Sequence, residues 1–175
     1  KSHVIFLGNV SRKNINFALN KNYKISKLNN YLKNENTIIF YNDGIDIKIE
    51  KNNIYLEQLT SLGRVLFESG NLKNKNIFFK GFIKEFKKNN LAIERNYLSG
   101  CLTFFNMNIS NLNLTFKDSI CEDAINLLNV DGNIKKIKVI NSKSDALDID
   151  FSNVQISNVE IKNALNDCLD FSFGN

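Results

Sequence analysis

Apolar and polar residues alternate strictly in the segment from Asp145 to Phe151, which reads DALDIDF. Alternation with a period of two is typical of a β-strand, because successive side chains of a strand point to opposite faces. We therefore predict that one face of this strand packs in a core and that the other, acidic face meets water. The core face carries Leu147, Ile149 and Phe151, and the other carries Ala146, Asp148 and Asp150.

This pattern recurs along the chain at an interval of 22 residues, with Asp123, Asp145 and Asp167 at the same place in three near-copies. A fixed period of this size is typical of a solenoid, whose coils stack on one another. Because neighbouring strands lie about 4.8 Å apart, each repeated residue becomes one member of a column that runs up the stack. A second column holds Asn126, Asp148 and Asp170, and a third holds Leu127, Ile149 and Phe171.

The repeat predicts an all-β fold, a single-stranded right-handed parallel β-helix with coils of 22–23 residues over residues 37–175. Its strands are expected to pair in parallel and in register, with Asp148 directly over Asp170. The paired strands comprise residues 101–105, 124–128, 146–151 and 168–173. The side chains expected to be buried include Leu147, Ile149, Leu169 and Phe171.

The two ends of the stack and one insertion depart from the repeat. Residues 1–36 are expected to form a cap or irregular segment, in which Ile25, Leu28 and Leu32 recur at helical spacing. The strand-like runs 37–41, 45–49 and 54–56 are expected to be the first coils. Residues 84–98 fall outside the repeat and are expected to protrude as a loop with at most a helical turn. The chain ends inside a coil, so we expect a truncated C-terminal end continued by further coils of a longer chain.

Asparagine and cysteine occupy particular columns. Asn141 and Asn163 stand 22 residues apart, and we expect inward asparagines stacked at a bend, which can hydrogen-bond to the neighbouring coil. Cys101 and Cys168 share a column with two alanines, which indicates small residues in a crowded position. They lie several coils apart and should not pair, and with Cys121 left over, the odd count argues against a disulfide framework.

Net charge is +5, but residues 1–117 carry a balance of +10 and residues 118–175 a balance of −5. The basic half lacks a stripe of aromatic and arginine residues of the kind that stacks on nucleic acid, so we expect no nucleic-acid partner. We also expect no direct membrane insertion, because the sequence contains no transmembrane run.

Three segments carry a resemblance: CEDAIN at 121–126, SDALDIDFSN at 144–153 and NDCLDFS at 166–172. They resemble the coils of right-handed parallel β-helix proteins, and are closest to β-helix regions of large, uncharacterised bacterial envelope and secreted proteins. The wider pectin lyase-like superfamily implies a polysaccharide or surface glycan as the partner. It also implies an extracellular or cell-envelope location.

A narrower resemblance concerns catalysis. Lys143-Ser144-Asp145 and Asn166-Asp167-Cys168 are similar to the Asn-Thr-Asp and Asp-Asp-Cys segments of polygalacturonases. The resemblance implies catalytic roles for Asp145 and Asp167, which would flank the attacking water. However, Asn166 stands where the general acid is expected, and an amide cannot donate a proton as a carboxylic acid does. The His-Gly-His and Arg-Ile-Lys elements are also absent from the sequence given.

The acidic columns offer binding chemistry as well. Hard oxygen ligands suit Ca²⁺, and the predicted calcium ligands are Asn126, Asp148, Asp150 and Asp170. Pectate lyases resemble this in using β-helix aspartates for a Ca²⁺ ion that bridges to an acidic sugar. The predicted carbohydrate ligands are Asp148, Asp150 and Asp170. For the column of Asp123, Asp145 and Asp167 we favour a bend at which the carboxylates accept backbone N–H bonds.

These patterns lead to one preferred function and two alternatives. The preferred function is a carbohydrate-facing or adhesive β-helix module of a bacterial envelope or secreted protein. The first alternative is a polysaccharide lyase or polygalacturonase-like glycoside hydrolase whose site is completed by coils outside this chain. The second is a structural spacer, because one fold hosts many functions.

Overall fold

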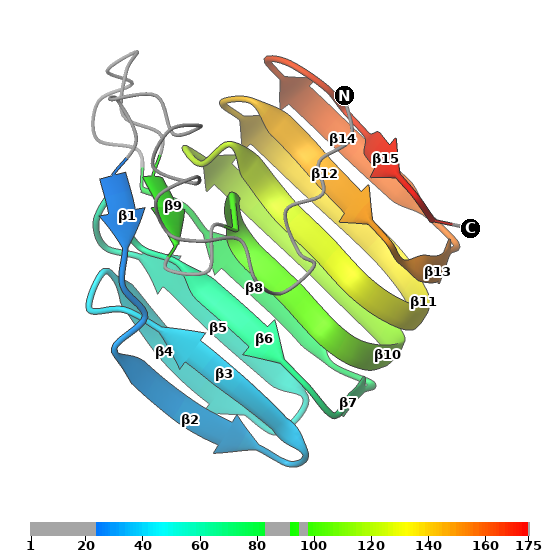
Figure 1. The fold of residues 1–175 in the computed structure, drawn as a ribbon, viewed down its shortest axis with the longest axis horizontal. Helices are drawn as coiled ribbons and strands as arrows, with labels where there is room; N and C mark the ends of the chain where they lie inside the picture. Colours follow the sequence, from blue (N-terminus) through cyan, green and yellow to red (C-terminus); the bar gives the residue numbers. More distant parts are fainter. Residues whose placement is uncertain (1–23, 83–91, 95–97, 175) are drawn as a thin grey trace, which may run out of the picture.

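The chain forms a β-solenoid of about five turns, with stacked parallel coils of about 23 residues (Figure 1). The computed structural model describes residues 24–82, 92–94 and 98–174. Most of the predicted N-terminal segment and most of the predicted loop at 84–98 therefore lie outside the described residues. The described part is all-β, as predicted, and contains no helix that is long and apolar enough to span a bilayer.

Fifteen strands make up the described chain. They are β1 (Lys24–Ser26), β2 (Asn30–Asn34), β3 (Thr37–Tyr41), β4 (Ile45–Glu50), β5 (Asn53–Gln58), β6 (Val65–Glu68), β7 (Asn71–Lys73), β8 (Asn76–Lys80), β9 (Ala92–Glu94), β10 (Gly100–Ser119), β11 (Asp123–Ser142), β12 (Asp145–Asp150), β13 (Asn153–Ile156), β14 (Val159–Ala164) and β15 (Asp170–Ser172).

The coils present three faces. The first face contains β2, β3, β6, the first parts of β10 and β11, β12 and β15. The second contains β7, the middle of β10 and β11, and β13, and the third contains β4, β5, β8, the last parts of β10 and β11, and β14. Both β10 and β11 are long enough to turn two corners and so contribute to all three faces. The predicted register is confirmed, because Asp148 pairs with both Asn126 and Asp170.

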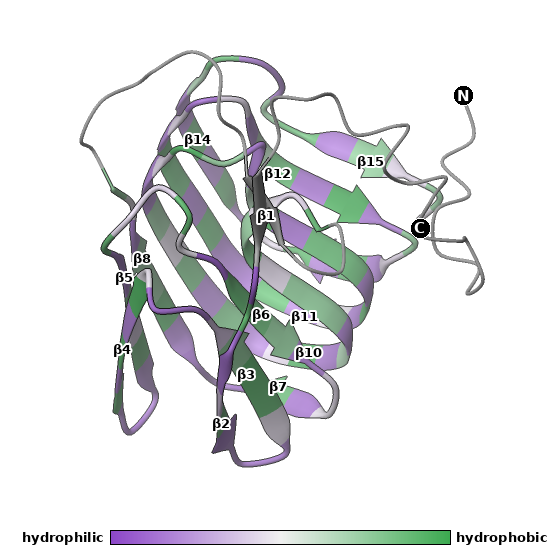
Figure 2. Cartoon of the chain, turned by 60° about the vertical axis from the view of Figure 1, so that its left-hand side comes forward, coloured by the Kyte–Doolittle hydropathy of each residue, from purple (hydrophilic) through white to green (hydrophobic). Residues whose placement is uncertain are grey.

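The core lies inside the coils and consists of apolar columns. Hydrophobic and hydrophilic bands alternate along strands such as β12 (Figure 2), and the hydrophobic members of adjacent coils stack. The rings of Phe67 and Phe104 stack at 5.1 Å, and those of Phe79 and Phe116 at 4.2 Å. Leu147 and Ile149 are buried, as predicted.

The burial predicted for Leu169 and Phe171 was wrong, because these side chains are 44% and 58% exposed. In sequence, Leu169 and Phe171 come one repeat after the buried residues Leu147 and Ile149. Phe171 pairs with Ile149 in the sheet. The difference is that Ile149 has a described coil on each side, whereas Phe171 has one on a single side. Alternation predicts which way a side chain points, but burial also needs a neighbour above and below it.

The N-terminal end is closed by two antiparallel hairpins rather than by the coils that we predicted for 37–41 and 45–49. β2 pairs with β3, and β4 with β5. Only β5 joins the stack in parallel, against β8. The reversals occur at Glu35 and Lys51, whose φ angles of 57° and 52° lie in the left-handed region of tight hairpin turns. The helical spacing of Leu28 and Leu32 was also misleading, since Leu32 lies in β2.

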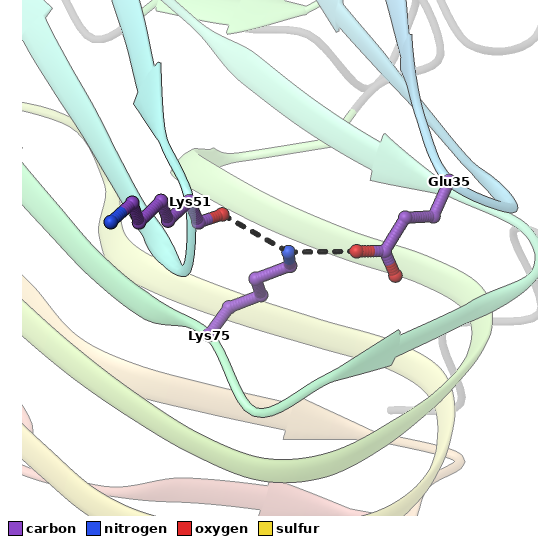
Figure 3. Close-up of polar contacts among 3 residues, drawn as sticks. All are labelled: Glu35, Lys51 and Lys75. Carbon is purple, nitrogen blue, oxygen red and sulfur yellow. Dashed lines mark hydrogen bonds and ion pairs between the residues drawn. The ribbon is translucent and has the colours of Figure 1, made fainter.

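A buried lysine fastens both hairpins to the stack (Figure 3). Lys75 is only 4% exposed, and its Nζ lies 2.8 Å from Glu35 Oε1 and 3.3 Å from the carbonyl oxygen of Lys51. These acceptors belong to the two hairpin turns. A buried ammonium is costly unless it is paired and hydrogen-bonded, so the contacts hold the two turns over the first coil.

Asparagine ladders run up the corners between faces. Asn129 Nδ2 donates to Asn106 Oδ1 at 2.7 Å, and Asn163 Nδ2 donates to Asn141 Oδ1 at 3.0 Å. All four residues have φ between 49° and 61°, a region that asparagine tolerates better than most residues. The hydrogen bond predicted for the column of Asn141 and Asn163 is therefore confirmed, but the expected inward placement was wrong, because this pair is exposed at a corner.

Cys101 and Cys121 form a disulfide, so the expectation of unpaired cysteines was wrong. Their Cα atoms lie 5.4 Å apart although 20 residues separate them in sequence. That separation is close to one coil, and the chain therefore returns to almost the same place. The odd cysteine is Cys168, which is exposed rather than in a crowded position.

Replacing Glu35 by Gln is expected to destabilise the protein more than replacing Lys75 by Met. The first change leaves a buried ammonium without its carboxylate and should cost about 1–3 kcal/mol. The second removes the buried charge, and its former acceptors lie in exposed turns that water can reach. Urea unfolding of both variants measures the difference. A larger loss for K75M would show that the lysine stem, and not the charge pairing, holds the hairpins.

Removing the disulfide by the double change C101A/C121A is expected to cost about 3 kcal/mol, the loop-closure contribution for a loop of this length. Thermal unfolding with and without a reductant should show the same loss in the native chain. The matched control is C168S, which changes an exposed thiol and should leave the melting temperature unaltered. An equal effect of all these variants would contradict the prediction.

Candidate functional site

The outer side of the first face changes character along the stack. One outward column runs through Leu66, Thr103, Asn126, Asp148 and Asp170, which pair in register from β6 to β15. Its members are apolar near the N-terminal hairpins and acidic toward the last described coil. The candidate site is the acidic end of this column together with the corner beside it.

The apolar end of the first face is covered. Leu66, Leu98 and Leu128 form a buried cluster, against which Leu28, Phe40 and Phe105 pack. Leu98 is the last residue of the segment that we expected to protrude, so this end of the insertion returns to the sheet instead. The next residue, Ser99, donates a hydrogen bond from its Oγ to Asp123 Oδ2. The acidic end of the face therefore lies next to a wall formed by Leu98 and Ser99.

The column of Asp123, Asp145 and Asp167 holds a bend. Asp145 Oδ1 accepts hydrogen bonds from the backbone N–H of Asp167 at 2.8 Å and from Asn166 Nδ2 at 2.7 Å. Asp123 is buried, and burial followed by the Asp148 charge raises its pKa well above the usual range. The two candidate catalytic residues are therefore neighbours, but the carboxylate of Asp145 supports the backbone of the next coil.

Asn126 and Asp148 are joined directly. Asn126 Nδ2 donates to Asp148 Oδ2 at 2.8 Å, and Asn126 is only 3% exposed. Within the described part of the chain, Asn126 Oδ1 and Thr103 Oγ1 are buried without a hydrogen-bond partner. Buried polar atoms normally have a partner, so the column carries unused hydrogen-bonding capacity next to the acidic residues.

Asp148 titrates near neutrality. Its pKa is raised to about 7, first by burial and then by the charges of Asp150 and Asp170, while the hydrogen bond from Asn126 opposes the shift. Like charges at strand spacing destabilise each other's ionised form. The predicted effect of neighbouring carboxylates is thus present at Asp148, although burial is the larger cause.

The predicted calcium ligands are only partly brought together. Asn126, Asp148 and Asp170 share one column, and Asp150 lies two residues further along β12, opposite Leu128 and Ser172. Among the residues that the structure describes, no group of three or more His, Cys, Asp or Glu side chains is arranged to hold a metal ion. Calcium binding by this face therefore stays a prediction.

An aromatic pair at the corner that follows the acidic residues was missed. Phe151 and Phe173 stack with ring centroids 5.1 Å apart and an angle of 8° between the rings, and they are 46% and 69% exposed. We had placed Phe151 in the core by alternation. β12 ends at Asp150, and Phe151 takes a corner conformation with φ of 48°, as Asn129 does one coil earlier. The spacing to Asn129 was the signal that marked a corner.

The chain matches no protein-family model, no curated protein and no solved structure. The β-solenoid itself is shown by the structure. Arguments about the site therefore rest on the contacts described above.

Replacing Asp148 by Asn is expected to stabilise the protein above about pH 7 and to be nearly neutral near pH 4. The folded-state pKa of about 7 exceeds the unfolded value of about 3.9. The folded state therefore holds the proton more tightly, and stability falls as pH rises between these values. The gain at pH 8 should be on the order of 2 kcal/mol.

Urea unfolding at several pH values measures this gain. The control is D131N, which changes an exposed aspartate on the second face and should show no such pH-dependent gain. A D148N variant that is destabilised at pH 8, or whose stability differs from the native chain equally at all pH values, would contradict the assignment.

Proposed function

We propose that this chain is a carbohydrate-facing binding module whose site lies on the outer side of the first face. The observation that carries the proposal is the exposed stack of Phe151 and Phe173 at the corner that follows Asp148 and Asp170 by three residues, on the same two coils. Carbohydrates present apolar C–H faces and polar hydroxyl edges. An aromatic surface next to a few placed polar groups meets both requirements.

The repeat favours a polymer over a small sugar. The two coils place equivalent side chains one strand spacing apart, about 4.8 Å, so the groups that would contact one sugar recur along the stack. Weak contacts to successive units of one chain add through effective concentration. A polysaccharide or surface glycan that lies along the stack is therefore the favoured partner, which suits an adhesive role.

The wall formed by Leu98 and Ser99 supports the same location. A flat sheet offers little surface to surround a ligand, whereas the edge of a cover adds a second side. Ser99 is held by its hydrogen bond to Asp123, and Leu98 by its packing on Leu66 and Leu128. Leu98 and Ser99 thus border the acidic end of the first face.

The disulfide favours the extracellular or cell-envelope location that the β-helix resemblance implies. Structural disulfides form and persist mainly in oxidising compartments, and Cys101 and Cys121 are fully buried in the core. The parallel β-helix architecture likewise supports a relationship to the pectin lyase-like superfamily, in which polysaccharides are the substrate class.

A second candidate function is glycoside hydrolysis, favoured by Asp148 alone. A carboxylic acid with a raised pKa beside a second carboxylate is the arrangement that glycosidases use. In that case Asp148 would be the acid and Asp170 its partner, in place of Asp145 and Asp167. Release of reducing ends from a polysaccharide panel, abolished by D148N, would favour hydrolysis over binding alone.

The binding proposal is tested with the double variant F151N/F173N. Asparagine occupies this corner in the two preceding coils and suits its left-handed conformation, so the fold should tolerate the change. A glycan array screen followed by calorimetry on the best ligand should show a loss of affinity of about tenfold or more, equivalent to about 1.4 kcal/mol.

The matched control removes a different aromatic pair. Tyr55 and Phe78 stack at 5.1 Å on the third face, and the next coil has Thr115 at this place. The control variant F78T should therefore bind like the native chain. The proposal fails if the screen finds no glycan, or if F151N/F173N and F78T change affinity equally.

A further inference from the structure

We propose that Asp123 makes the attachment of the wall, Leu98 and Ser99, to the first face sensitive to pH. The wall is attached when Asp123 is protonated and is released when Asp123 ionises. This inference rests on the proposed function in one respect, because it describes how binding at the site beside the wall is regulated. It follows from the burial of the Asp123 carboxyl, from its neighbours and from the contacts of the wall.

The Asp123 carboxyl is buried against a hydroxyl group. Asp123 is only 3% exposed, and Ser99 Oγ contacts its Oδ2. Among the residues that the structure describes, no lysine or arginine forms an ion pair with Asp123. Asp118 is also buried, but it accepts a hydrogen bond of 2.7 Å from Asn141 Nδ2. An amide N–H only donates, whereas a hydroxyl can donate to an ionised carboxylate or accept from a protonated one. The partner of Asp123 therefore suits either protonation state.

The described charges that act on Asp123 are all negative. Glu122 precedes it in the chain, Asp145 pairs with it in the sheet, and Asp148 lies further along the same strand, β12. Burial raises the pKa of Asp123 well above its usual range, the Asp148 charge is the second cause, and the hydrogen bond from Ser99 opposes the shift. An ionised carboxylate in these surroundings is costly. Contact with water would relieve that cost.

The wall is the part of the surroundings that can move at low cost. Asp123 begins β11, which pairs with β10 on one side and β12 on the other, so a shift of Asp123 would disturb two coils. Leu98 and Ser99 precede β10, and Leu98 packs only in the small cluster with Leu66 and Leu128, apart from the main core. Segments with few buried contacts open more readily than core strands. Release of the wall is therefore the easiest way to expose the carboxyl.

A contact at the other end of the insertion contains no titratable group. The backbone N–H of Phe82 donates to Gln58 Oε1 at 3.0 Å, and Gln58 Nε2 donates to the carbonyl oxygen of Gly63 at 3.0 Å. Gln58 is 3% exposed, and its amide carries no charge in either contact. A change of pH should therefore act at Ser99 and not at Phe82.

The direction of the effect follows from the difference between the two states. The pKa of Asp123 is higher with the wall attached than with it released, because release lets water reach the carboxyl. The attached state thus holds the proton more tightly. Attachment should be complete below the ordinary aspartate pKa of about 3.9 and should be lost as pH rises through the raised pKa. Release of one proton limits the change to about tenfold per pH unit.

The experiment uses the variant F105W as a reporter. The chain contains no tryptophan, and Phe105 packs against the cluster that contains Leu98. Acrylamide, an uncharged quencher, reports how accessible the new indole ring is, and circular dichroism reports whether the coils stay folded. We expect the quenching constant to increase at least about twofold from about pH 5 to about pH 9, because a covered ring becomes exposed.

Two kinds of variant assign the effect to Asp123. D123N/F105W should show no increase in quenching with pH, and D123A/F105W provides a second chain without an ionisable group at this place. The matched control, D131N/F105W, replaces an exposed aspartate of the second face and should behave like F105W. Constant quenching in F105W, or an equal increase in both Asp123 variants, would overturn the inference.

Binding is tested separately, by calorimetry with the best ligand of the glycan screen. The affinity of the native chain should fall by at least about tenfold, equivalent to about 1.4 kcal/mol, over the same pH range. D123N should reduce this fall to the part that Asp148 contributes. An equal fall in both chains would overturn the regulation of binding. Absence of any glycan ligand would overturn the proposed function, and the link to binding with it, whereas the quenching result tests the attachment of the wall without a ligand.

Discussion

Parallel, in-register stacking constrains every position of this fold, because each side chain lies about 4.8 Å from its counterpart in the next coil. Columns of apolar side chains are stabilised, because each side chain packs on an apolar side chain of the next coil, as the stacked rings of Phe67 and Phe104 show. Polar columns need side chains that can bond to copies of themselves. Asparagine meets this need with one donor group and one acceptor group, and the ladders through Asn106–Asn129 and Asn141–Asn163 use it. Aspartate cannot do so when ionised.

The period of 22 residues was sufficient to predict the columns and the register, including Asp148 over Asp170. The period did not predict side-chain burial where the alternation of apolar and polar residues ends. Phe151 was assigned to the core because alternation was carried one residue past the end of β12, into a corner where the left-handed conformation turns the side chain outward. Phe171 pairs with buried Ile149 as predicted, but Phe171 and Leu169 are exposed, because burial depends on coils on both sides.

The remaining differences arose from long-range proximity that a repeat does not encode. Cys101 and Cys121 occupy unrelated places in the repeat, yet one coil of chain brings them together. The hairpins at the N-terminal end reverse direction at Glu35 and Lys51, which are ordinary charged residues in sequence. Their contact with Lys75 needs two turns to meet one buried side chain, and no local pattern predicts that. The candidate acidic residues were found by sequence, whereas their aromatic neighbours were not.

Stability alone does not explain the residue composition of the outward column on the first face. Asn126 and Asp148 occupy equivalent positions in successive coils, so the backbone accepts an amide at this place as well as a carboxyl. An amide at all three positions would continue a ladder of the kind seen at the corners, without like charges. The chain instead has two stacked carboxyls beside two exposed rings, an arrangement that costs stability near neutral pH. Residues that weaken a fold in this way are commonly retained for function.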